Sequence, residues 1–240
     1  MNKLTVQEKR MYDVMCAIKE HNVPVVYKGA LITKLILQEN QFSEFIRETQ
    51  DIDASWVGAS PPSMDNLTAM LNNSINILGL IAVVVREHGE KTSASYDVFG
   101  AAHGELVMTI DIDMRKTVES QTYHFGNVSF QGVTPNNVIA DKISVIASDK
   151  VFRRAKDLVD LYALLHCVIV KTTDIHGIWE RESRIIGNFS AFTGRPDELR
   201  HAYEKLRRLD VKPEFDMMYV YLKILSPFYR KKHRCDHLGK

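Results

Sequence analysis

The sequence has few cysteines, almost no net charge and no long apolar run, and each absence excludes a class of protein. Its three cysteines, Cys16, Cys167 and Cys235, are odd in number and far apart, which excludes a disulfide framework and favours a reduced cytoplasm. A formal net charge of +1 gives no global attraction to nucleic acid, so any RNA contact must be local, and we expect no DNA partner. The longest apolar run, residues 77–85, is too short to span a bilayer. The N-terminal residues MNKLTVQEKR lack the apolar segment of a signal peptide, so we expect a cytoplasmic protein without a membrane partner.

The composition is that of an ordinary globular protein, with 45% hydrophobic and 25% charged residues in 240. The hydrophobic spacing predicts an α/β (α+β) fold: a small mixed sheet with flanking helices over residues 1–132, followed by a helical domain over residues 133–240. Strands are expected at residues 25–27, 51–57, 80–86, 96–101, 105–114 and 122–130. Helices are expected at residues 5–22, 30–37, 63–77, 155–166, 174–187, 196–209 and 214–228, and after Thr134 or Asn136.

Residues 25–57 carry the strongest local signal in the chain. A β-branched and aromatic run, VVY, is followed by Gly29 and then by helical apolar spacing. A glycine turn that opens a helix directs backbone N–H groups toward an anion. The segment therefore predicts a strand, an anion-binding turn and a helix.

Asp51 and Asp53 lie two residues apart in the next expected strand, so their side chains share one face. Two neighbouring carboxylates repel each other, and a divalent cation relieves that repulsion. Mg²⁺ prefers such oxygen ligands together with substrate phosphates. The combination of turn and acid pair indicates nucleotide-dependent transfer; the alternative is a solvated strand end.

A second acid pair, Asp111 and Asp113, occurs in the alternating stretch ELVMTIDIDM. A third carboxylate facing the first pair would complete a two-metal site or act as a general base. We favour Asp111, because the longer apolar run before it places it nearer the centre of the sheet. The alternatives are Asp113 and a half-exposed strand with polar outward positions.

Four short motifs occur in order: YKGAL at residues 27–31, RxTxDID at 47–53, ADKI at 140–143 and RxKDLVDLY at 154–162. Together they resemble the AbiEii/AbiGii toxin family of nucleotidyltransferases, within the DNA polymerase β-like nucleotidyltransferase superfamily. The resemblance covers residues 20–166, and the last motif is the specific one. The remaining residues match only in being helical.

The resemblance implies an enzyme that transfers NMP from an NTP to an acceptor hydroxyl, such as the tRNA 3′ end, and so blocks translation. It also implies two Mg²⁺ ions and a cognate antitoxin. By position, Asp51, Asp53 and Asp111 match the metal ligands, Lys142 matches a lysine near the triphosphate, and Asp157 matches an acid needed for activity. The expected nucleotide-binding residues are Lys28, Gly29, Ala30 and Lys142.

One position departs from the family pattern, because Ala30 stands where a second glycine or a serine is usual. Alanine keeps its backbone N–H but loses conformational freedom and any hydroxyl contact. A catalytically impaired nucleotide- or antitoxin-binding module therefore stays open. A small-molecule nucleotidyltransferase stays open as well, because the sequence does not distinguish an RNA acceptor from a small molecule. Two site residues also have alternatives to the roles that the resemblance implies. Lys142 could be a surface lysine, and Asp157 could form a local ion pair with Arg153 or Arg154.

Overall fold

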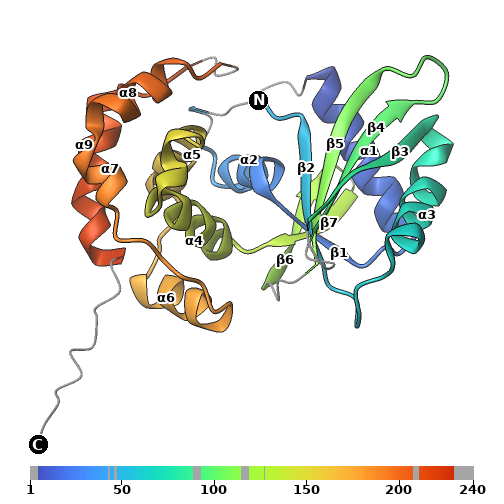
Figure 1. Cartoon of the computed structure of the whole chain (residues 1–240), viewed down its shortest axis with the longest axis horizontal. Coiled ribbons are helices and arrows are strands. Elements are labelled where there is room, and N and C mark those ends of the chain that lie inside the picture. Colours follow the sequence, from blue (N-terminus) through green and yellow to red (C-terminus); the bar gives the residue numbers. More distant parts are fainter. Residues whose placement is uncertain are drawn as a thin grey trace, which may run out of the picture. The chain divides into compact units, whose positions relative to one another are not determined.

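The computed structural model describes residues 5–42, 44–45, 48–88, 93–114, 119–126, 128–207 and 211–229 (Figure 1). Arg47 of the second motif and Cys235 lie outside these ranges. The chain forms two compact units, the first ending at Val138 and the second beginning at Ile139. The expected division into residues 1–132 and 133–240 stays a prediction. Within the described ranges, no helix has both the length and the apolar character needed to cross a membrane.

The described part of the first unit is built on a seven-stranded mixed sheet in the order β3-β4-β5-β2-β1-β7-β6. The strands are β1 Val25–Lys28, β2 Asp51–Trp56, β3 Leu80–His88, β4 Ser93–Gly100, β5 Leu106–Asp113, β6 Ser120–Phe125 and β7 Val128–Val133. β2 pairs with β5, and β1 with β7, in parallel; the other neighbours are antiparallel. The expected mixed sheet with flanking helices is confirmed.

The prediction of a single strand over residues 122–130 is wrong. Two antiparallel strands, β6 and β7, occupy this region, with Phe125 opposite Val128. The chain reverses at Gly126, whose φ of +56° lies in the left-handed region that glycine adopts easily. Because both strands have alternating side chains, their sequences read as one continuous strand.

Three helices belong to the first unit: α1 Val6–Glu20, α2 Gly29–Glu39 and α3 Met64–Ile75, the last followed by the 3-10 turn Asn76–Leu78. α1 and α3 cover one face of the sheet, which we call the core face (Figure 1). The hydroxyl of Tyr27 on β1 donates to the Met15 carbonyl of α1 at 3.2 Å, and Asn72 of α3 donates to the Ala82 carbonyl of β3 at 3.1 Å. Seven consecutive residues of α2, from Leu31 to Leu37, are buried, as expected for a helix that is apolar on most sides.

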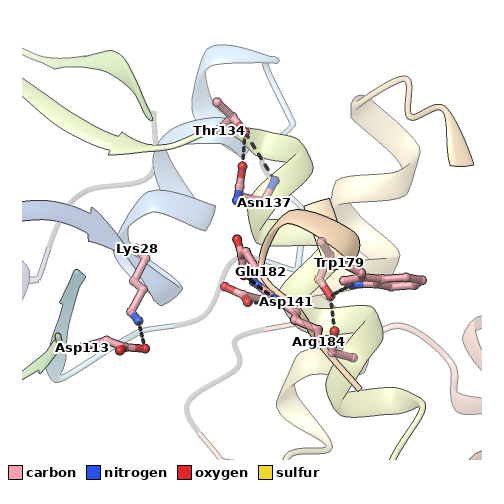
Figure 2. Close-up of polar contacts among 10 residues, drawn as sticks. Lys28, Asp113, Thr134, Asn137, Asp141, Trp179, Glu182 and Arg184 are labelled. Carbon is pink, nitrogen blue, oxygen red and sulfur yellow. Dashed lines mark hydrogen bonds and ion pairs between the residues drawn. The ribbon is translucent and has the colours of Figure 1, made fainter. Parts of the chain in front are cut away.

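The second unit is helical in its described part. Its helices are α4 Pro135–Ile146, which begins in the first unit, α5 Lys156–Cys167, α6 Thr172–Arg181, α7 Ser190–Gly194, α8 Pro196–Glu204 and α9 Phe215–Leu225, with 3-10 turns at Asp149–Phe152 and Ser226–Tyr229. Thr134 caps α4, since its hydroxyl accepts from the Asn137 N–H at 3.4 Å (Figure 2). Trp179 is fully buried and its indole N–H donates to the Ala140 carbonyl at 3.2 Å. The short helix α7 was not expected from the sequence.

Candidate active site

Polar side chains stand in one row across four neighbouring strands of the sheet. The strand registers align Ser95 with Asp111, Asp111 with Asp53, and Asp53 with Lys28. We call these four residues the polar row. Residues directly opposite each other in a sheet share a face, so the register alone brings Asp53 and Asp111 together on adjacent parallel strands, about 4.8 Å apart.

The row lies on one face because side chains alternate along each strand. Ile52, Ile110 and Ile112 are at most 1% exposed and point to the core face. The intervening acids Asp51, Asp53, Asp111 and Asp113 therefore point the other way, and we call their side of the sheet the acidic face. The alternation predicted from the sequence is confirmed for both acid pairs.

Three of these acids interact with neighbouring side chains: two accept a hydrogen bond from a hydroxyl, and one forms an ion pair with a lysine. The hydroxyl of Thr109 donates to Asp51 Oδ1 at 2.9 Å, and the hydroxyl of Ser95 donates to Asp111 Oδ1. Lys28 Nζ lies 3.3 Å from Asp113 Oδ2 (Figure 2). Such bonds orient carboxylates and offset their mutual repulsion.

Gly29 brings the backbone into contact with the acidic face at the start of α2. Its φ is +72°, and a Cβ added there would lie 1.9 Å from Asp53 Oδ2. Glycine is thus required twice, for the left-handed conformation and for the close approach. The first turn of α2, which includes Ala30, consequently begins beside the Asp53 carboxylate. The roles of Gly29 and Ala30 toward a nucleotide stay predictions.

The donor set suits a hard cation, because Asp51, Asp53 and Asp111 offer only oxygen ligands. No group of three or more His, Cys, Asp or Glu side chains is arranged to hold a metal in the part of the chain that the structure describes. The metal-binding roles therefore stay predictions. The register favours Asp111 over Asp113 as the third carboxylate, because Asp113 lies opposite Ser55 and pairs with Lys28.

Lys142 and Asp157 meet in the second unit, at the start of α5. Lys142 Nζ lies 3.1 Å from Asp157 Oδ1 and 2.7 Å from Asp160 Oδ2. Arg154 Nε lies 2.8 Å from Asp157 Oδ2, so the expected local pair with Arg154 is present. The alternative of a surface lysine is wrong, because Lys142 is 6% exposed. The roles of Lys142 and Asp157 toward a nucleotide stay predictions.

A second ionic group surrounds Asp141, the neighbour of Lys142 in the ADKI motif. Arg184 Nη1 lies 2.5 Å from Asp141 Oδ1, and the same guanidinium pairs with Glu182 (Figure 2). The sequence reasoning missed Arg184, and also Ser95 and Thr109. The two hydroxyl residues follow the alternation of the acids, but only the strand register identifies them as partners.

Comparison with known proteins gives one family match and several solved structures of similar fold. A family model described as nucleotidyl transferase AbiEii toxin of a type IV toxin–antitoxin system matches residues 42–221. A search of curated proteins found no significant match. Among solved structures, the nucleotidyltransferase toxin MenT4 of Mycobacterium tuberculosis H37Rv is similar, with a TM-score of 0.57 and 14% identity over 93% of this chain and 82% of that chain. The antibiotic-resistance factor ANT(2″)-Ia is less similar, with a TM-score of 0.47 and 13% identity over 83% of this chain and 98% of that chain.

The likeness to MenT4 concerns the fold, and the family model supplies the membership. The family model spans most of the chain, including the two acid pairs and the residues Lys142, Asp157 and Asp160. The chain belongs to the AbiEii nucleotidyltransferase toxin family of type IV toxin–antitoxin systems.

Proposed function

We propose that this nucleotidyltransferase uses Mg²⁺ to transfer NMP from an NTP to a terminal hydroxyl of RNA, such as the tRNA 3′ end, and thereby blocks translation. The observation that carries the proposal is the polar row. Two carboxylates, Asp53 and Asp111, lie in register on parallel strands, and the Gly29 turn contacts one of them. Acids beside the start of a helix form a site for a cation and a phosphate together.

The triphosphate is expected at the Gly29 turn. The first backbone N–H groups of α2 have no partner within the helix and carry its positive dipole, so they attract an anion. Ala30 supplies its N–H there as a glycine would. Lys28 adds an ammonium group 3.3 Å from Asp113, at the same end of the polar row.

Asp51, Asp53 and Asp111 are the residues that would hold Mg²⁺. When bound, the ion would neutralise phosphate charge during transfer. The hydrogen bonds from Thr109 to Asp51 and from Ser95 to Asp111 fix the direction of these carboxylates. Fixed charges of this kind favour transfer because they need no rearrangement as the reaction proceeds.

The reaction itself requires only positioning and charge stabilisation. The acceptor hydroxyl attacks the α-phosphorus, the bond to the bridging oxygen of the β-phosphate breaks, and pyrophosphate leaves. We assign to Asp111 the further role of accepting the hydroxyl proton. Lys142 and Asp157 remain the proposed contributors from the second unit, and a cognate antitoxin is the proposed protein partner. Retention of all three carboxylates favours an active enzyme over an impaired binding module.

The test is transfer of label from each of the four NTPs, with Mg²⁺, to total RNA and to tRNA. Asp53→Asn should reduce transfer more than 100-fold, a cost of about 2.7 kcal/mol or more in the transition state. Asp65→Asn, an exposed acid at the start of α3, is the matched control and should retain activity. Normal transfer by Asp53→Asn would contradict the assignment of the polar row. Labelling of a small-molecule fraction in place of RNA would favour the other acceptor class.

A further inference from the structure

The edge strand β3 contains a β-bulge whose position matters for the polar row. Val84 lies opposite Tyr96, but the next aligned pair is Arg86 with Ser95, so Val85 is an additional residue. Tyr96 is fully buried on the core face. Val84, opposite Tyr96, shares the core face, and strict alternation would place Arg86, two residues later, on that face too. The additional residue Val85 instead brings Arg86 to the acidic face.

Arg86 extends the polar row by one strand. It is aligned with Ser95, and Ser95 is aligned with Asp111. Two strand spacings separate Arg86 from Asp111, about 9.6 Å between backbones. One extended nucleotide unit and an arginine side chain span this length easily.

The side chains before Arg86 on the same face are apolar and exposed. Ile81, Val83 and Val85 are 43%, 47% and 56% exposed. Of the alternate residues, Leu80 and Ala82 are at most 2% exposed and Val84 is half-buried. β3 thus presents an aliphatic strip beside the carboxylates. We call these three residues and Arg86 the β3 strip.

The charges on this face indicate what the β3 strip binds. Arg86 is exposed and forms no ion pair with any residue that the structure describes, whereas Lys28, at the opposite end of the row, pairs with Asp113. Asp97 lies opposite Val83 and disfavours an anion there. An anionic group is therefore expected at Arg86 and an apolar, planar group over the aliphatic residues, which is the chemistry of a phosphate and a base.

We propose that the β3 strip is the acceptor subsite for a single-stranded RNA 3′ end. Arg86 binds a backbone phosphate, the aliphatic residues contact a terminal base, and the terminal hydroxyl reaches Asp111. This inference rests on the proposed transfer to RNA and specifies where that RNA binds.

The test compares Arg86→Gln with the wild-type protein for RNA and NTP separately. Arg86→Gln should raise the KM for RNA about 10-fold and leave both kcat and the KM for NTP unchanged, because the residue contacts only the acceptor. The dependence of log Kd for RNA on log salt should fall by about 0.7, the loss of one phosphate contact on a single strand. Arg86→Lys should keep the wild-type salt dependence.

One control and one further variant separate this inference from its alternatives. Arg10→Gln removes an exposed arginine of α1, which covers the other face, and should change neither the KM nor the salt dependence. Replacing Val83 and Val85 together by threonine should raise the KM for RNA several-fold with no change for NTP. If the wild-type protein labels RNA but Arg86→Gln behaves like Arg10→Gln, the acceptor subsite is wrong while the proposed function stands. If no RNA is labelled, the proposed function fails and this inference fails with it.

Discussion

Replacing Lys142 by methionine tests the buried charge cluster of the second unit. Methionine preserves most of the side-chain length and removes the charge. The ammonium lies 3.1 Å from Asp157 and 2.7 Å from Asp160, and these two carboxylate side chains are 0% and 4% exposed. Without it, two buried carboxylates face each other, and Arg154 pairs with Asp157.

The expected loss is about 3–5 kcal/mol of unfolding free energy, the usual cost of removing one partner of a buried ion pair. Arg154 offsets little of this, because its side chain is 51% exposed and pairs at exposed sites are weak. Stabilities of single domains are about 5–15 kcal/mol, so the variant should be strongly destabilised. Combining Lys142→Met with Asp157→Asn and Asp160→Asn should recover part of the loss, since no unpaired charge then remains buried.

Urea unfolding followed by tryptophan fluorescence measures this change. The chain has two tryptophans, so a Trp56→Phe background leaves Trp179 as the reporter of the second unit. Lys150→Met, at an exposed lysine in the turn before α5, is the control and should stay within about 0.5 kcal/mol of the background. A similarly small change for Lys142→Met would refute the buried-cluster reasoning.

The same samples test the nucleotide role expected from the family resemblance. At urea concentrations where Lys142→Met is still folded, NTP binding should be weaker by about 10- to 100-fold, or about 1.4–2.8 kcal/mol. Unchanged affinity in the folded variant would show that Lys142 only holds α4 and α5 together.

Two further predictions concern the Gly29 turn and the buried tyrosines. Gly29→Ala should reduce transfer more than 10-fold, because the added Cβ would meet Asp53 Oδ2. Gly104→Ala is the control, since Gly104 also has a positive φ, +67°, but an added Cβ there would have no atom within 4 Å. It should lower the free energy of unfolding by about 1–2 kcal/mol and leave activity unchanged. Burial raises the pKa of Tyr203 to about 12, above its value of about 10 in the unfolded chain. The native state therefore retains a proton that the unfolded chain loses, so stability should fall between about pH 10 and 12 in urea titrations. Tyr203→Phe should flatten that fall, and a pH-independent stability of the wild-type protein across this range would contradict it.

Local patterns were enough to predict the segment around the first acid pair. The strand, the Gly29 turn, α2 and the face shared by Asp51 and Asp53 depend on neighbours within a few residues. The two-residue period likewise placed Asp111 on one face of its strand. What the sequence does not contain is the register between β2 and β5, which depends on packing across the whole sheet. Ser95 and Thr109 could not be identified as partners of these acids for the same reason.

The second unit illustrates a different limit of sequence reasoning. The spacing of Lys142, Asp157 and Asp160 on two helices was compatible with an exposed or a buried arrangement. Burial is decided by tertiary contacts, such as those of Trp179 with α4, that leave no short-range signal. Similarly, the bulge in β3 is defined by its pairing with β4, and the valine run reads the same with or without it.

The pairing of β2 with β5 has a consequence for how the toxin becomes active during its synthesis. Aligned residues of these strands, such as Asp51 and Thr109, are 58 positions apart, and α3, β3 and β4 lie between them in the chain. Closing so long a loop costs entropy that only the later contacts repay. The ribosome releases β1 and β2 first, so a nascent chain carries Asp51 and Asp53 before Asp111 exists to join them. With the role proposed for Asp111, we therefore expect transfer activity to appear only after the β3–β4 hairpin has formed, and a chain that ends before β5 to be inactive.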